Sequence, residues 1–228
     1  SATEGKVTLN AGNDILSATS QAVINGASEL TMCAGGSIGE ADNAIALSGG
    51  NEQLIAKISA GNNINIDGSR LTHSAVVADL TAGDAVGFTS SADLVATVKA
   101  SDIALTSTQG SITADVEQIA KLDSSQRFDA TAAKDISVTV GEGKGNLGLG
   151  KVESTDGNVL INLEEGTVFD AIDRSEETTL TAEERIALWK DLGLIGENGE
   201  DIGEQNWKSD MQKAEAAVVN DYERYEAY

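Results

Sequence analysis

The sequence predicts an all-β fold, a parallel β-helix followed by a C-terminal α-helical hairpin, on three observations. A short motif recurs every twenty-odd residues, short bursts of alternating apolar and polar residues lie between its copies, and the 228-residue chain has 24 glycines but no proline. A repeat of this length is typical of a solenoid, in which each unit is stable only when stacked on its neighbours. Proline would remove a ladder hydrogen bond from almost any strand of such a stack.

The repeated motif has the form aliphatic-x-Ala-Gly-x-x-aliphatic. Its copies are Leu9–Ile15 (LNAGNDI), Met32–Ile38 (MCAGGSI), Ile58–Ile64 (ISAGNNI) and Leu80–Val86 (LTAGDAV), with degenerate forms at Val98–Ile103 (VKASDI) and Ala130–Ile136 (ATAAKDI). The alanines of the first four copies are 23, 26 and 22 residues apart. We expect the last aliphatic residues of these copies to point inward and form one column: Ile15, Ile38, Ile64 and Val86.

The stretch from Ala130 to Phe169 shows the strand and corner pattern most clearly. Its apolar bursts are too short for helices and are separated by Gly, Asp or Asn. We place Gly150 at a tight corner and expect it to have a positive φ. Residues 5 to about 170 are expected to form seven or eight coils of two or three strands. The segment Thr113–Gln126 lacks the motif and is expected to hold a loop or a poorly formed strand.

Composition excludes several partners. The net charge is −22 with a pI near 4.1, which disfavours binding to nucleic acid and to anionic membranes. No apolar run is long enough for a membrane span. Cys33 occupies a core-like position and is interpreted as a small buried hydrophobe rather than a reactive thiol. The sequence has no starting Met and no signal peptide, and it is expected to be a segment of something longer.

Residues 1–173 are predicted to hold the β-helix repeats, and residues 174–228 an α-helical extension. Thr181 and Glu184 form a capping box ahead of a helix, and an apolar stripe from Trp207 to Tyr225 marks a second helix. We expect the two helices to pack together through Trp189 and Trp207. The pair either caps the last coils near Val168 and Phe169 or presents a face to a partner.

No catalytic, cofactor-binding or metal-ligating residue is assigned. Gly145 to Lys151 has the outline of a phosphate-binding loop, but Val152 replaces the Ser or Thr that would hold Mg²⁺. The single histidine, His73, is expected at a coil corner or on the surface. A solvated face is favoured over a Ca²⁺ site for the acidic residues Glu164, Glu165, Asp170, Asp173, Glu197, Glu200, Asp201 and Glu204, because their spacing fits no calcium motif.

Three segments carry a resemblance to a known family. Gly36–Leu47 (GSIGEADNAIAL), Ala60–Ile66 (AGNNINI) and Gly145–Val168 (GNLGLGKVESTDGNVLINLEEGTV) resemble the repeats of filamentous-haemagglutinin-like exoproteins. These are very large adhesins and leukotoxin-type filamentous proteins that Gram-negative bacteria export by two-partner secretion. The resemblance covers roughly residues 5–173. It implies a right-handed β-helix shaft that folds outside the cell, on the cell surface or secreted, with a two-partner secretion transporter for the parent protein and a host-cell receptor or the extracellular matrix as partner.

Two classes of function remain. The favoured one is a non-enzymatic structural and interaction segment of an adhesin or toxin that acts in virulence as a rigid shaft. The alternative is a carbohydrate-active β-helix enzyme, either a polysaccharide lyase or a glycosidase. A lyase acting on polyuronate needs cations for the substrate carboxylates, and a glycosidase needs two carboxylates about 5 to 9 Å apart. The ratio of 15 Lys and Arg to 37 Asp and Glu, with 4% aromatic residues, disfavours the enzyme.

Overall fold

The computed structural model describes residues 5–19, 23–119 and 126–171, which form two parallel β-sheets of eight strands each. The odd sheet contains β1 (Gly5–Ala11), β3 (Ala27–Ala34), β5 (Gln53–Ala60), β7 (Ala75–Ala82), β9 (Asp93–Ala100), β11 (Ile112–Gln118), β13 (Ile136–Val140) and β15 (Val159–Leu163). The even sheet contains β2 (Val23–Asn25), β4 (Ile45–Gly49), β6 (Ile64–Leu71), β8 (Ala85–Ser90), β10 (Asp102–Ser107), β12 (Arg127–Ala132), β14 (Leu147–Ser154) and β16 (Val168–Asp170).

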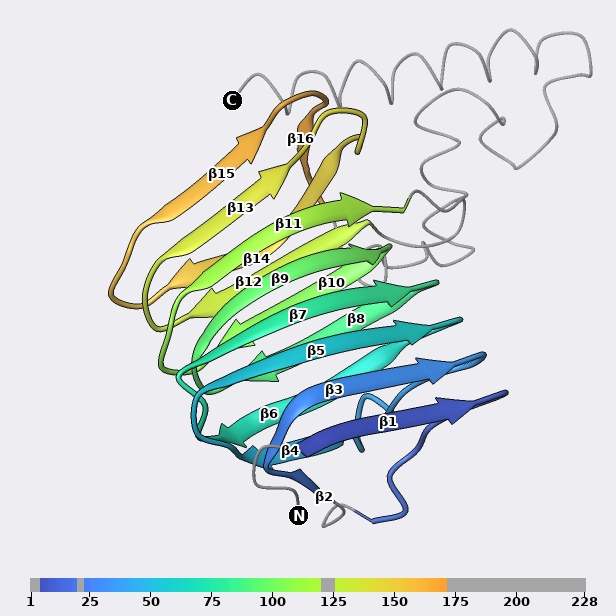
Figure 1. Cartoon of the computed structure of the whole chain (residues 1–228). Helices are drawn as coiled ribbons and strands as arrows, with labels where there is room; N and C mark the ends of the chain where they lie inside the picture. The colour runs from blue at the N-terminus through green and yellow to red at the C-terminus, as the bar shows by residue number, and fades with distance from the viewer. Residues whose placement is uncertain (1–4, 20–22, 120–125, 172–228) are drawn as a thin grey trace, which may run out of the picture. The chain divides into compact units, whose positions relative to one another are not determined.

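The chain alternates between the two sheets and so winds into a β-solenoid (Figure 1). Each strand pairs in parallel with the strand two places along the chain, and the eight strands of a sheet are separated by seven turns. This confirms the predicted parallel β-helix and its number of coils, and of the two or three strands expected per coil it shows two. The predicted boundary at residue 173 and the helical hairpin concern residues that lie outside the described ones, and they stay predictions.

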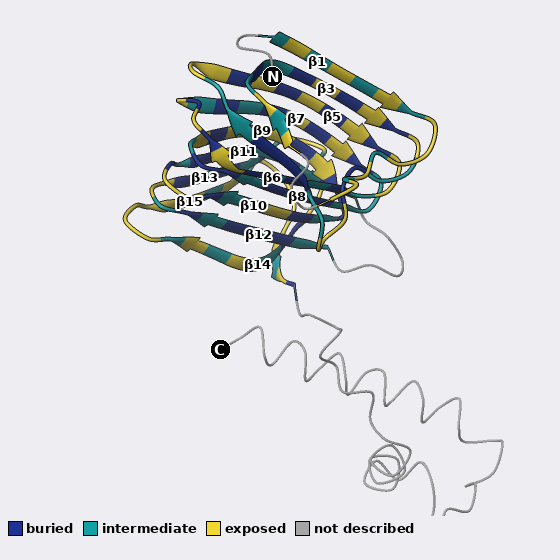
Figure 2. Cartoon of the chain, turned by 90° about the horizontal axis from the view of Figure 1, so that it is seen from below, coloured by how far each residue is buried: buried dark blue, intermediate teal, exposed yellow. Residues whose placement is uncertain are grey.

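Alternating burial along the strands builds the core between the sheets. In β5, β7 and β9 the residues from the second onward alternate strictly between inward and outward positions, a pattern that Figure 2 shows across the odd sheet. Successive inward residues lie in register from coil to coil, so they stack in columns along the solenoid. Such stacked aliphatic side chains remove the apolar surface of each coil from water, which is the main stabilising contribution of the core.

The predicted aliphatic column is confirmed. Ile15 bridges to Ile38, Ile38 bridges to Ile64, and Ile64 pairs with Val86. The last three are almost fully buried, and Ile15 is partly buried against the same core. The column continues beyond the first four motif copies through Ile103, Phe128 and Leu149.

The motif glycine is needed because neighbouring coils approach closely at this corner. A Cβ on Gly35 would overlap the carbonyl oxygen of Gly12, one on Gly61 that of Gly35, and one on Gly83 that of Gly61. These three glycines are not among those with positive φ. Steric contact between stacked corners therefore explains the Ala-Gly pair in the motif.

Gly150 does not lie at a corner, and the prediction of a positive φ was wrong. It lies inside β14, at a register shift where Phe128 pairs with Leu149 but Ala130 pairs with Val152. The extra residue in β14 is a β-bulge. A side chain at Gly150 would overlap the side chains of Arg127 and Asp129, so close approach, not backbone conformation, is the reason for glycine here.

Two other segment predictions need correction. The degenerate copy at Ala130–Ile136 lies at the opposite corner of the coil, because Ala130 belongs to β12 of the even sheet and Ile136 to β13 of the odd sheet. In Thr113–Gln126, the residues up to Gln118 form part of the regular strand β11, whereas residues 120–125 lie outside the described ones, so the loop expected there stays a prediction. Gln118 turns inward, and its Oε1 accepts a hydrogen bond from the Gly148 amide at 2.8 Å.

Cys33 is exposed on β3, so its assignment to the core was wrong. It alternates with the buried residues Met32 and Ala34 and pairs in register with Asn10 and Ser59. Those polar neighbours occupy the same position in other motif copies. Because a strand has a two-residue period, a single place in register decides between core and solvent.

Asp and Asn side chains join successive coils at the corners. The side-chain oxygen of one coil accepts a hydrogen bond from a backbone amide of the next, in the pairs Asp14–Ser37 (2.6 Å), Asn63–Ala85 (3.2 Å), Asp93–Ser111 (2.8 Å), Asp135–Asn158 (2.7 Å) and Asn146–Thr167 (2.9 Å). These bonds satisfy amides that the sheet ladders do not reach. Some of the acidic residues of the chain therefore stabilise the fold by joining successive coils.

Candidate functional site

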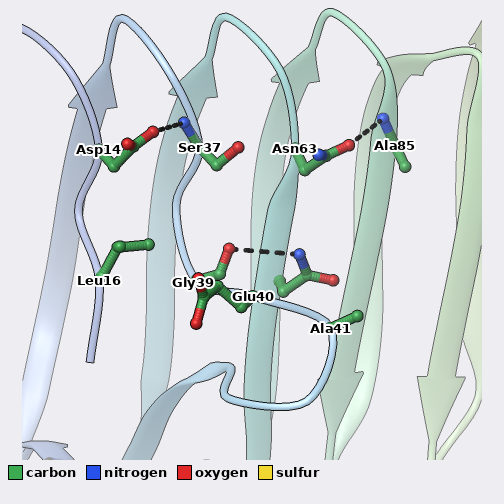
Figure 3. A pocket seen from close by; sticks show the side chains of 9 residues that line it. Asp14, Leu16, Ser37, Gly39, Glu40, Ala41, Asn63 and Ala85 are labelled. Atoms are coloured by element: carbon green, nitrogen blue, oxygen red, sulfur yellow. Dashed lines mark hydrogen bonds between the residues drawn. The ribbon is translucent and has the colours of Figure 1, made fainter. Parts of the chain in front are cut away.

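A shallow groove of about 460 Å³ lies along one corner of the first coils (Figure 3). It is lined by Asp14, Leu16, Ser37, Gly39, Glu40, Ala41, Asn63, Asn65 and Ala85. These residues come from the segments that connect the odd sheet to the even sheet and from the first residues of β6 and β8. We consider this groove as a candidate site because it is concave and brings residues of several coils together.

One wall of the groove is built by equivalent positions of the repeated motif. Asp14, Ser37, Asn63 and Ala85 each come immediately before the stacked aliphatic residue of their coil. The inward aliphatic column therefore holds these residues in a row on the outside. Figure 3 shows the side chains of Asp14 and Asn63 directed at the backbone of the next coil, where each accepts an amide hydrogen bond.

The other wall is the excursion Gly39–Asn43, which lengthens the second coil. Glu40 and Asn43 exchange two backbone hydrogen bonds at 3.2 and 3.1 Å, and Asn65 Nδ2 donates to the Gly39 carbonyl at 3.4 Å. Gly39 has a φ of 69°, and a Cβ there would overlap the Asn65 carbonyl oxygen. Glycine at this position therefore lets the chain turn outward above the next coil.

The groove is acidic and has no cation. Its ionisable lining residues are Asp14 and Glu40, and one carboxylate oxygen of Asp14 already accepts the Ser37 amide. The lining also includes no aromatic side chain on which a sugar ring could stack. The groove can accept hydrogen bonds from hydroxyl groups, but it repels anions such as phosphate and polyuronate.

His73 lies at the corner between β6 and β7, as predicted, but it is buried, with 6% of its surface exposed. Its Nε2 is 3.0 Å from the Ala27 carbonyl oxygen, and its Nδ1 has no partner. Burial lowers the pKa of His73, and the hydrogen bond to Ala27 opposes that change only in part. Of the two predicted positions, corner or surface, the structure shows the corner, and the buried ring is not accessible as a base.

The remaining candidates of the sequence do not form a site in the described part of the chain. Strand β14 runs through Gly150 and Lys151, and the Lys151 amide donates to Asp129 while its ammonium pairs with Glu153. Glu164 accepts the Glu142 amide at 2.9 Å. Within residues 5–19, 23–119 and 126–171, no three metal-ligating side chains converge. Of the acidic residues named from the sequence, Asp173 and those from Glu197 onward lie outside the described residues.

Sequence reasoning did not find the groove, although a signal for it was present. The second and third motif alanines are 26 residues apart where the flanking intervals are 23 and 22, and the extra residues include Gly39–Asn43. An insertion at one repeat of a solenoid maps to a surface excursion. The spacing could therefore have located the excursion, but not its hydrogen bonds.

No protein-family model matches this chain, and neither does any curated protein or solved structure. Within the described ranges, no helix is long and apolar enough to cross a membrane.

Proposed function

We propose that this chain is a non-enzymatic structural and interaction segment, the rigid β-solenoid shaft of a large secreted or cell-surface bacterial adhesin or toxin of the filamentous-haemagglutinin-like kind. The observation that carries the proposal is the unbroken stacking of inward columns through the coils, such as the one that contains Ile38, Ile64 and Val86. The proposed coil is right-handed, which is the hand of nearly all parallel crossover connections.

The stacked architecture suits a spacer. Every interior strand is hydrogen-bonded to a neighbour on each side, so bending the shaft would strain two sheets and a close-packed core together. Several of its described corners carry Asp and Asn side chains that accept hydrogen bonds from backbone amides of the next coil. A shaft of this kind holds a binding surface at a fixed distance without any chemistry of its own.

The acidic groove is the observation that bears on the enzyme alternative. A glycosidase would use Asp14 and Glu40 as its two carboxylates, and a lyase would need a cation that the groove does not provide. One oxygen of Asp14 is held by the Ser37 amide, a bond that serves the stacking of the first two coils. This arrangement supports a structural role for the groove.

The test combines binding and turnover. The purified chain is applied to cultured host cells and to immobilised extracellular-matrix proteins, and it is incubated with neutral and acidic polysaccharides while reducing ends and unsaturated products are measured. The proposal predicts saturable binding with no turnover. Turnover that is lost in Asp14→Ala or Glu40→Ala would favour the enzyme, and absence of binding to every surface would remove the interaction role.

A further inference from the structure

An exposed row of aliphatic side chains crosses the outer face of the odd sheet. Ile55 on β5, Val77 on β7 and Val95 on β9 lie in register on neighbouring strands. Ile55 is 51% exposed and Val95 is 45% exposed, while Val77 between them is half-buried. We call these three residues the aliphatic row.

The aliphatic row is unusual for its place in the solenoid. The other large exposed hydrophobics in the described residues lie on the first and last coils: Leu16, Val23, Val159, Leu160 and Val168. At those ends the core itself is incompletely covered. Ile55 and Val95 lie on central coils whose inward columns are fully buried, so an uncovered core does not explain their exposure. Clustered exposed apolar residues of this kind mark interaction surfaces.

Two opposite charges accompany the aliphatic row. Lys57 follows Ile55 two residues along β5, Asp79 follows Val77 on β7, and the two charged residues pair in register. All four side chains therefore point outward from the same face. Lys57 and Asp79 form no ion pair in the described part of the chain.

We propose that this face binds a second copy of the chain, with a twofold axis running along the strand direction between β5 and β7. This axis places Ile55 against the second copy's Val77 and Lys57 against the second copy's Asp79. A twofold contact makes each pair twice, so two apolar and two ionic pairs form. The inference is independent of a role at the cell surface, because it requires only the geometry of the face.

The charge distribution favours a second copy over an unrelated acidic or basic partner. The whole chain carries a net charge of −22, yet on β5 and β7, the two strands beside the axis, the outward charges are one cation and one anion on each copy, so this part of the contact adds no net charge. Four strands of this sheet present roughly 500 Å² at their usual spacing. That area is below the roughly 800 Å² per partner of a stable complex, so the dimer is expected to be weak and dependent on concentration.

The experiment measures molecular mass against concentration by sedimentation equilibrium, using the full chain and two charge-reversal variants. Lys57→Asp alone and Asp79→Lys alone each place like charges opposite one another, and each is expected to weaken the dimer roughly tenfold or more. An equimolar mixture of the two variants restores opposite charges across the contact, and it is expected to associate about as well as the unaltered chain.

Two further variants separate the contact from folding. Val77→Thr keeps the β-branched shape but removes the apolar contact, and it should weaken association while the circular dichroism melting curve stays close to that of the unaltered chain. Thr139→Asp, on the outer face of β13 outside the contact, should leave association unchanged. A chain that stays monomeric at all concentrations, or a dimer whose two reversed variants do not recover on mixing, overturns the proposal.

Discussion

Replacing Ile64 with alanine should destabilise the solenoid strongly. Ile64 is 0% exposed and lies between Ile38 and Val86 in the inward column. The change removes three carbon atoms, about 2.4 kcal/mol at about 0.8 kcal/mol each, and leaves a cavity that the coils above and below cannot fill because their ladders fix their spacing. We expect a total loss of about 3 to 4 kcal/mol in the free energy of unfolding.

Urea unfolding followed by far-ultraviolet circular dichroism measures this loss. Ile64→Val removes one carbon and should cost about 1 kcal/mol. Leu16→Ala removes a side chain that is 49% exposed in the groove and should change stability by no more than about 0.5 kcal/mol. If Ile64→Ala costs no more than Leu16→Ala, Ile64 is not part of a packed column and the reasoning fails.

Three other predictions concern single positions. Burial lowers the pKa of His73 below its ordinary value of 6.5, so the unfolded chain takes up the proton first as pH falls, and the folded chain loses stability below about pH 6.5. His73→Gln should flatten this pH dependence of the free energy of unfolding. An imidazole that titrates above pH 6.5 by NMR contradicts the prediction. Gly50→Ala should lower the melting temperature more than Gly143→Ala. Both glycines have positive φ, for which alanine costs about 1 kcal/mol of stability, but only at Gly50 would the added Cβ overlap the His73 ring. Equal melting shifts argue against that contact. Asp93→Ala should lose about 1 kcal/mol, whereas Asp93→Asn keeps the oxygen that accepts the Ser111 amide and should melt near the unaltered chain; if both lose the same stability, the carboxylate charge matters instead.

The coil architecture could be predicted because the motif combines spacing with chemistry. Each motif alanine is followed at the same distance in sequence by an aliphatic residue, and a solenoid stacks residues at equivalent positions of successive repeats. The column through Ile38 and Ile64 follows from that rule. The intervals of 26 and 22 residues did not disturb it, because the additional residues of the longer coil leave the register of the odd-sheet strands unchanged.

The errors arose where register, and not period, decides the environment. Cys33 is one place from buried residues on either side, and a single place changes the face of a strand. Gly150 belongs to a bulge, which depends on Asp129 and Arg127 from the preceding coil. His73 is buried because Gly50, from the previous coil, leaves space for its ring. For Gly150 and His73 the deciding neighbour is distant in sequence, so local patterns carry little signal for it.

Distances between spin labels along the odd sheet test the central claim most directly. The native Cys33 on β3 carries one label, and the second is placed in turn on outward positions of β9, β11 and β15 through Lys99→Cys, Glu117→Cys and Asn162→Cys. These strands are three, four and six places from β3 in the sheet order. Electron paramagnetic resonance should give separations of roughly 14, 19 and 29 Å, one strand spacing per coil. Distances that do not rise with the number of intervening strands would contradict a stacked parallel solenoid.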